Sequence, residues 1–227
     1  MPLPRNVRVG VDGAEVSALA GTLTGGRWIL GLTGCPGAGK STLAAALAQI
    51  LGDRSVVVPM DGFHLADREL DRQGVRERKG APETFDPSGY AALLRRLRAH
   101  PADTVYAPGF DRSFEQPVAG AIAVAAAVSG VITEGNYLLL DQPQWHQVRA
   151  QLDEVWFVFT DDSLRVERLV ARHVRSGKSP ESARDWVARV DEPNARLVEA
   201  SRAAADRQLD VTAWDGRPGR RGAMCLV

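Results

Sequence analysis

The stretch at 34–41, GCPGAGKS, restricts the fold of this chain more than any other feature. It matches the pattern G-x-x-x-x-G-K-[ST], with the apolar run WILGLT before it at 28–33 and a run of helix formers after it at 41–51. Strand, glycine loop and helix in this order form a phosphate-binding loop. The glycines allow backbone N–H groups to turn around phosphate oxygens, because a Cβ at the tight positions would clash. The sequence therefore predicts a phosphate-binding α/β domain.

This loop and the first helical turn have expected roles at a nucleoside triphosphate. Lys40 should reach the β- and γ-phosphates, and the hydroxyl of Ser41 should join the coordination of Mg²⁺. The N-terminus of the helix adds favourable potential for phosphate. We expect nucleotide contacts from Gly34, Pro36, Gly37, Ala38, Gly39, Lys40, Ser41 and Thr42.

Short apolar runs recur along the chain, and two of them end on acidic residues. Asp61 follows the run at 56–60, and Glu134 follows the run at 131–133. Further runs stand at 155–159 and 209–211. Their alternation with helical segments predicts a three-layer P-loop NTPase fold, with a mainly parallel five-stranded sheet, helices on both faces and room for antiparallel edge strands. Ligands bind at the carboxyl ends of such strands, so Asp61 and Glu134 should lie beside the phosphate loop.

The remaining segments predict one domain over 1–212. The charged, irregular stretch at about 62–86 reads as an insertion on the acceptor side, followed by a helix that Asp86 caps. Asp161 or Asp162 can cap a helix that runs to about Arg175, and Ser179 can cap the next one, so 161–190 is a candidate helical lid. The basic, glycine-rich tail at 213–227 is expected to be disordered.

Composition excludes several classes of partner. Lys plus Arg equals Asp plus Glu at 28 each, so the chain lacks the positive field that nucleic acid or an anionic membrane would attract. No run is long and apolar enough for a signal peptide or a membrane span. The chain has two cysteines, Cys35 and Cys225, and a disulfide at Cys35 would obstruct the glycine loop. This cysteine usage favours a reducing cytoplasm. The sequence leaves the oligomeric state open.

Three further motifs follow the glycine loop in order: MDGFH at 60–64, RKGAPETFD at 78–86 and TEGNY at 133–137. Together they resemble the phosphoribulokinase, uridine kinase and bacterial pantothenate kinase superfamily. The match is nearest its nucleoside/nucleotide kinase branch, also called fructose-transport-related kinases, and covers 28–211. The resemblance implies a kinase that uses ATP and Mg²⁺ to phosphorylate a hydroxyl of a small molecule, whether nucleoside, pantothenate-like compound or sugar.

The resemblance also implies roles for single residues. Asp61 would orient and deprotonate the acceptor hydroxyl, and Glu134 would hold Mg²⁺ through water. The candidate acceptor contacts are His64, Arg78, Lys79, Asn136 and Tyr137. Four of these have a simpler interpretation that stays open: His64 as a hydrogen-bonded structural residue, Arg78 and Lys79 as an exposed charged loop, and Tyr137 as a core residue.

Four arginines recur along the first lid helix at spacings of three, four and three. Arg165, Arg168, Arg172 and Arg175 would therefore share one helix face. Taken alone, such a stripe is a solvated surface. In the kinases that the chain resembles, lid arginines close over the phosphates, which implies a catalytic role for Arg168 and Arg172 and leaves Arg165 and Arg175 nearer to surface status.

Two other functions remain open. A regulatory ATPase would use lid motion as its signal, but it would need neither the base Asp61 nor the Arg-Lys-Gly loop. A nucleoside monophosphate kinase would need a clamp for the acceptor's phosphate, which the basic stretch 76–79 could supply. The guanine-reading Asn-Lys-x-Asp box and the Leu-Ser-Gly-Gly-Gln transporter signature are both missing, so GTPases and transport ATPases are disfavoured.

Overall fold

The computed structural model describes residues 7–99 and 102–218, and the sheet within them has six strands, all parallel, in the order β1-β8-β7-β2-β6-β3. These strands are β1 (Val7–Gly10), β2 (Trp28–Thr33), β3 (Ser55–Pro59), β6 (Gly130–Glu134), β7 (Glu154–Phe159) and β8 (Arg207–Asp210). The expected α/β architecture is confirmed, but the expected strand number was one too low. The additional strand is β1, which lies parallel to β8 at the edge of the sheet.

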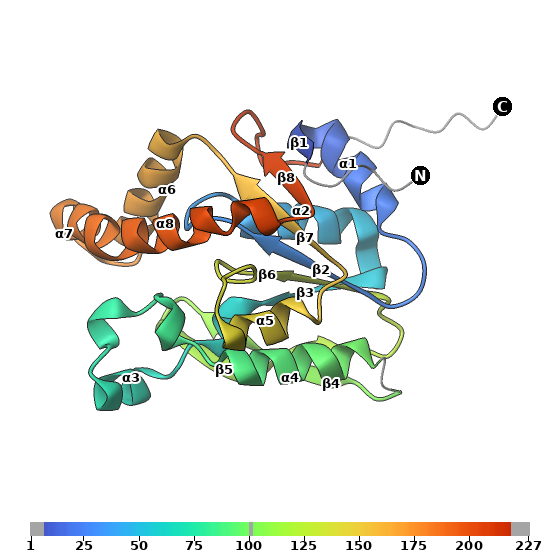
Figure 1. The fold of residues 1–227 in the computed structure, drawn as a ribbon, viewed down its shortest axis with the longest axis horizontal. Coiled ribbons are helices and arrows are strands. Elements are labelled where there is room, and N and C mark those ends of the chain that lie inside the picture. Colours follow the sequence, from blue (N-terminus) through green and yellow to red (C-terminus); the bar gives the residue numbers. More distant parts are fainter. Residues whose placement is uncertain (1–6, 100–101, 219–227) are drawn as a thin grey trace.

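Helices cover both faces of the sheet (Figure 1). On one face lie α1 (Gly13–Thr22) and α2 (Lys40–Leu51), and on the other lie α4 (Pro87–Arg98), α5 (Pro143–Arg149) and α8 (Glu192–Ala200). The other helices, α3 (Asp67–Gln73), α6 (Asp162–Arg175) and α7 (Pro180–Trp186), gather at the end of the sheet to which the strands point (Figure 1). A π-helical turn, Val187–Asp191, joins α7 to α8.

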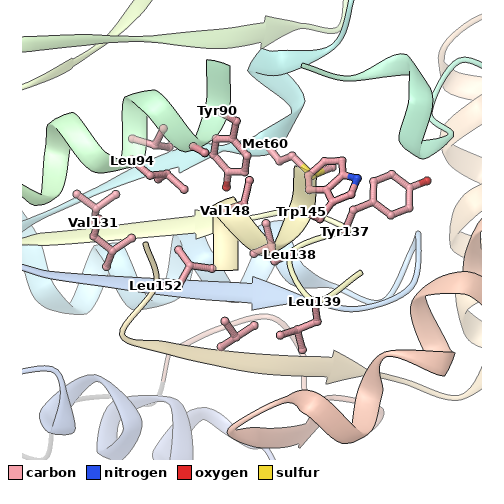
Figure 2. Packing of buried hydrophobic residues seen from close by; sticks show 14 of the residues in the cluster. Met60, Tyr90, Leu94, Val131, Tyr137, Leu138, Leu139, Trp145, Val148 and Leu152 are labelled. Carbon is pink, nitrogen blue, oxygen red and sulfur yellow. The ribbon is translucent and has the colours of Figure 1, made fainter. Parts of the chain in front are cut away.

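The two hydrophobic cores follow from side-chain alternation along the buried strands. On β6, Val131 faces the core under α4 and α5, while Ile132 faces the core under α1 and α2. Both side chains are fully buried, as expected for a parallel strand that helices cover on each side. Figure 2 shows the core under α4 and α5, where Tyr90 and Leu94 of α4 pack near Trp145 of α5.

A β-hairpin that the sequence analysis did not assign forms a separate two-stranded sheet. Its strands are β4 (Val105–Asp111) and β5 (Gln116–Val124), and their register shifts between Ala107 and Gly109. The hairpin packs closely against the segment that follows β3. The contact is so tight that a Cβ on Gly62 would lie 2.4 Å from the carbonyl oxygen of Pro108. The turn of the hairpin is thereby held close to Asp61.

The predicted helix starts are confirmed at three caps. Asp86 accepts a hydrogen bond from the N–H of Gly89 at 2.8 Å, and Asp161 accepts one from the N–H of Ser163 at 2.9 Å. Ser179 caps α7 in the same way. The stretch 62–86 is less irregular than expected, since it contains α3 and several 3₁₀ turns.

The chain beyond β8 differs from the expected disordered tail as far as it is described. Trp214 is only 7% exposed and packs in the core of α1 and α2, and its Nε1 donates to the carbonyl of Arg217 at 2.7 Å. Residues 213–218 thus continue the fold, while 219–227 lie outside the described residues. Across the described ranges, no helix combines the length and the apolarity that crossing a bilayer requires.

Candidate active site

The glycine loop joins β2 to α2 and packs against β7 and α6. Two of its positions require glycine. Gly34 has a φ of 149°, and a Cβ on it would lie 2.0 Å from the carbonyl oxygen of Val158. Gly37 has a φ of 82°, and its Cβ would lie 2.8 Å from the carbonyl oxygen of Arg165. The loop therefore holds a backbone path that other residues could not follow, as a phosphate cradle needs.

Lys40 is buried at the start of α2 with its ammonium fully engaged. Its Nζ donates to the carbonyls of Gly34 at 2.9 Å and Cys35 at 3.0 Å, and to the side-chain oxygen of Asn136 at 2.7 Å. Burial lowers the pKa of Lys40, although Glu134 opposes that shift. Asn136 therefore positions the lysine, in addition to lining the cleft where an acceptor could reach it.

Ser41 and Glu134 form a second pair beside the loop. The Ser41 hydroxyl donates to Oε1 of Glu134 at 2.9 Å, and the glutamate side chain ends β6 with the residue only 8% exposed. Burial and the nearby Asp61 raise the pKa of Glu134, while Lys40 lowers it. A hydroxyl and a carboxylate oxygen are ligands that Mg²⁺ prefers, so this pair fits such an ion. The described residues contain no cluster of three His, Cys, Asp or Glu side chains, so phosphate and water would supply the other ligands.

Asp61 stands in a 3₁₀ turn directly after β3, and it has a partner that the sequence did not reveal. Nη2 of Arg112, from the turn of the β4–β5 hairpin, lies 3.1 Å from Oδ2 of Asp61. The Asp61 side chain is 28% exposed, so it remains accessible from the cleft. No sequence pattern marks Arg112, because only the fold of the hairpin brings it to the end of β3.

On the lid, the structure separates the four arginines. Arg168 and Arg172 line the cleft, and neither guanidinium makes a hydrogen bond or an ion pair to another described residue. Arg175 also lines the cleft and is exposed. Arg165 was expected near the surface, and that expectation is wrong: it is 4% exposed and pairs with Asp162 at 2.9 Å and Glu192 at 2.7 Å.

A cleft of about 870 Å³ joins the loop, the strand ends, the hairpin and the lid. Most of the predicted site residues line it: Pro36, Gly37, Gly39, Lys40, Ser41, Thr42, Asp61, His64, Lys79, Glu134, Asn136, Arg168 and Arg172. Gly34 and Ala38 of the loop do not, and neither do Arg78 and Tyr137. One connected cavity thus contains a phosphate cradle, a magnesium-compatible pair and a carboxylate, which is the set that phosphoryl transfer requires.

Comparison with known proteins gives the family. The candidate uridine kinase C227.14 of Schizosaccharomyces pombe is 35% identical over 191 residues, which cover 79% of this chain and 81% of that protein. The protein YggC of Escherichia coli is also 35% identical, over 82% of this chain and 78% of its own length. This chain belongs to the P-loop kinases of the phosphoribulokinase and uridine kinase superfamily. No family model matches it.

Solved structures support the same assignment for the kinase. A candidate fructose transport system kinase from Silicibacter sp. TM1040 matches with a TM-score of 0.75 and 37% identity, over 85% of this chain and 98% of the other. YFH7 of Saccharomyces cerevisiae, which has a circular permutation, matches with a TM-score of 0.72 over 87% of this chain and 96% of its own. At 20% identity, YFH7 shows the shared fold alone.

Two predicted acceptor contacts lie away from the kinase cleft. Tyr137 is fully buried, donates its hydroxyl to the carbonyl of Gly80, and packs against Trp145 at 5.5 Å between ring centroids (Figure 2). Arg78 pairs with Glu83 at 2.7 Å, and its side chain is 66% exposed. Tyr137 is therefore a core residue and Arg78 a surface residue. The alternation of side chains along a strand could not predict the burial of Tyr137, because Tyr137 lies after the end of β6.

The kinase cleft also contains residues that the sequence analysis did not propose. Phe110 and Glu115 come from the hairpin, and Asp67 comes from the start of α3. On the lid side, Trp186 lines the cleft, with Nζ of Lys178 4.4 Å from the centroid of its ring. These additional cleft residues therefore come from three segments that are far apart along the chain: the start of α3, the hairpin and the lid.

Proposed function

We propose that this kinase transfers the γ-phosphoryl group of Mg-ATP to a hydroxyl of a small molecule. The observation that carries the proposal is the position of Asp61, which follows β3 and opens on the same cleft as Lys40 and Glu134. In phosphoryl transfer the protein mainly positions the reactants and stabilises charge, and the common cleft of these three side chains supports both roles for them.

In the proposed reaction Asp61 accepts the proton of the acceptor hydroxyl. The acceptor oxygen then bonds to the γ-phosphorus, and the bond from that phosphorus to the β,γ-bridging oxygen breaks, with ADP as the leaving group. Lys40 neutralises charge on the β- and γ-phosphates. Magnesium, held through Ser41 and Glu134, would add charge neutralisation at the same oxygens.

The lid arginines complete the proposed charge balance. Arg168 and Arg172 have no carboxylate partner among the described residues, so their charges are available for phosphate oxygens. Such groups act mostly in the transition state, where negative charge spreads over the transferred group.

The free, buried thiol of Cys35 supports a reducing, cytoplasmic setting for the enzyme.

The two other functions receive less support. A nucleoside monophosphate kinase would use the basic stretch 76–79 as a phosphate clamp, but Arg76 already pairs with Asp67 and Asp71, each at 2.8 Å. Lys79 pairs with the same Asp67 at 2.6 Å. A regulatory ATPase would not need a carboxylate aimed at an acceptor site.

The test is ADP release by the purified enzyme with Mg-ATP and a panel of alcohols, sugars and nucleosides. We expect at least one acceptor to stimulate ADP release by tenfold or more, and Asp61→Asn to abolish that stimulation while ATP still binds. Arg72→Ala is a matched control, because the Arg72 side chain is 71% exposed, pairs only with Glu69 among the described residues and does not line the cleft. If ADP release proves independent of every acceptor, the kinase assignment of this site is wrong.

A further inference from the structure

His64, three residues after Asp61, has a fixed orientation in the cleft. Its Nδ1 lies 2.9 Å from the backbone carbonyl oxygen of Asp61. The rings of Phe85 and Phe110 pack against the imidazole, with centroids at 4.0 and 4.9 Å. Because a carbonyl oxygen can only accept, Nδ1 must carry the hydrogen of this bond.

The second ring nitrogen of His64 is therefore a hydrogen-bond acceptor. Burial lowers the pKa of His64, although Asp61 opposes the shift, so the imidazole is neutral near pH 7. In a neutral imidazole with a hydrogen on Nδ1, the lone pair lies on Nε2. Nε2 makes no hydrogen bond within the described part of the chain, and His64 lines the cleft. A ligand hydroxyl or N–H could donate to it.

The cations on this side of the cleft already have carboxylate partners. Lys79 pairs with Asp67 at 2.6 Å and also donates to the backbone carbonyl of Glu115. Arg76 pairs with Asp67 as well, and Arg112 pairs with Asp61. An anionic group on the acceptor would have to share these cations with carboxylates that already offset their charge, and it would lie close to those carboxylates.

The carboxylates, in contrast, are in excess. Glu77 and Glu115 line the cleft, and their side chains make no hydrogen bond or ion pair with any residue in the described ranges. Apart from Lys40, the cleft cations that lack a carboxylate partner in those ranges belong to the lid: Arg168, Arg172, Arg175 and Lys178. The cleft cations that lack a carboxylate partner within the described chain are thus those of the loop and the lid, whereas His64, Glu77 and Glu115 add hydrogen-bond acceptors to the cleft.

We propose that the acceptor is an uncharged molecule with several hydroxyl groups, and that His64 Nε2 accepts a hydrogen bond from one of them. This inference rests on the proposed kinase function and specifies its substrate class. Hydroxyl groups are donors that suit the imidazole nitrogen and the free carboxylates of Glu77 and Glu115. Phe110 supplies apolar surface for the carbon skeleton, as aromatic side chains do in pockets for polar ligands.

The experiment compares matched acceptors that differ in charge. ADP release is measured with uridine against uridine 3′-monophosphate, ribose against ribonate, and glucose against gluconate, at saturating Mg-ATP. We expect the uncharged member of at least one pair to give a kcat/KM at least tenfold above that of its anionic counterpart. A preference for the anionic members would overturn the inference and leave the kinase function standing, whereas no stimulation by either kind would overturn both.

Substitution of His64 tests the assigned hydrogen bond with the preferred acceptor. His64→Phe keeps an aromatic ring and removes Nε2, so we expect the acceptor KM to rise about tenfold, the usual worth of one neutral hydrogen bond, with the ATP dissociation constant unchanged. His64→Gln restores an acceptor oxygen and should recover part of that loss. Arg72→Ala again serves as the control. An unchanged acceptor KM in His64→Phe would show that Nε2 does not contact the substrate.

Discussion

Replacing Arg165 with alanine should separate a structural arginine from the catalytic ones on the same helix. Arg165 is buried and joins α6 to the start of α8 through Glu192, whose side chain is 31% exposed. Its second partner, Asp162, is 89% exposed, so that pair contributes little to stability. The loss of the Glu192 pair and of the packed aliphatic stem should cost about 2 kcal/mol. For a domain of this size, that lowers Tm by about 4–8 °C.

Arg172→Ala should have the opposite profile. Arg172 has no ion-pair partner within the described ranges, so its removal leaves no carboxylate unpaired, and stability should change by less than about 0.5 kcal/mol. Turnover should fall about a hundredfold, because charge stabilisation at the transferred phosphoryl group is lost. Lysine at this position should restore only part of the rate, since an ammonium lacks the planar fork of guanidinium.

The assay combines calorimetric unfolding with acceptor-dependent ADP release for four single alanine variants, at positions 165, 168, 172 and 175. The expected pattern is a low Tm for the first, low turnover with normal Tm for the second and third, and small changes for the last. Equal, mild losses in all four would mean that the stripe acts as a solvated helix face. A normal Tm in Arg165→Ala would show that its two ion pairs contribute no stability.

Four further outcomes are expected. Asp61→Asn should lower acceptor-dependent turnover about a hundredfold with ATP affinity near that of the parent by calorimetry; an equal fall in ATP affinity would place Asp61 in the nucleotide site instead. Gly34→Ala should unfold at a clearly lower temperature or fail to fold, because its Cβ would meet the carbonyl of Val158 at 2.0 Å, and an unchanged Tm would contradict that geometry. Burial raises the pKa of Cys35 to about 11, so little reactive thiolate is present at pH 8. Peptide mapping after iodoacetamide treatment at that pH should show Cys35 labelled about two orders of magnitude more slowly than an ordinary thiol, and fast labelling would contradict the raised pKa. The pKa of His64 is lowered in the folded state, so the unfolded chain binds the proton more readily and the free energy of unfolding should fall as the pH drops below about 6.5. His64→Phe should weaken this pH dependence, and identical pH profiles for the variant and the parent would argue against the lowered pKa.

The parts of the site that the sequence predicted are those set by local order along the chain. The octet at 34–41 carries its own strand and helix, so its fold follows from neighbouring residues. Asp61 and Glu134 each end a buried strand, and parallel strands bring their carboxyl ends to one edge. β3 and β6 are indeed paired, with Pro59 opposite Glu134. This pairing explains why two short motifs far apart in sequence meet at the loop.

The parts that were missed depend on tertiary contacts. Helical spacing alone does not distinguish Arg165 from Arg172, and only the fold brings Glu192, at the start of α8, to Arg165. The same limit applies to Tyr137, whose burial depends on Phe85 and Trp145 from other elements. Periodicity identifies a helix face but not what covers it.

The missed hairpin has a different cause. Pro108, Gly109 and Gly120 interrupt the two strands, and such residues weaken the strand signal. The hairpin nonetheless supplies Arg112 and Phe110 to the acceptor side. The proposed acceptor site was therefore the least predictable part of the molecule, because the elements that line it have weak sequence patterns.

The pairing of β1 with β8 has a consequence for how the chain folds as it is synthesised. Val7 lies opposite Arg207, so of the six strands in this sheet the one synthesised first pairs with the one synthesised last. Until β8 emerges, β1 has no partner in the sheet, and β7 lacks the neighbour that pairs with it along Trp156–Phe159. Contacts this distant in sequence form slowly, since the intervening chain must first be brought together. The sheet can therefore close only after translation has passed residue 210, and nascent chains that stop earlier would present an open strand edge to chaperones or to one another.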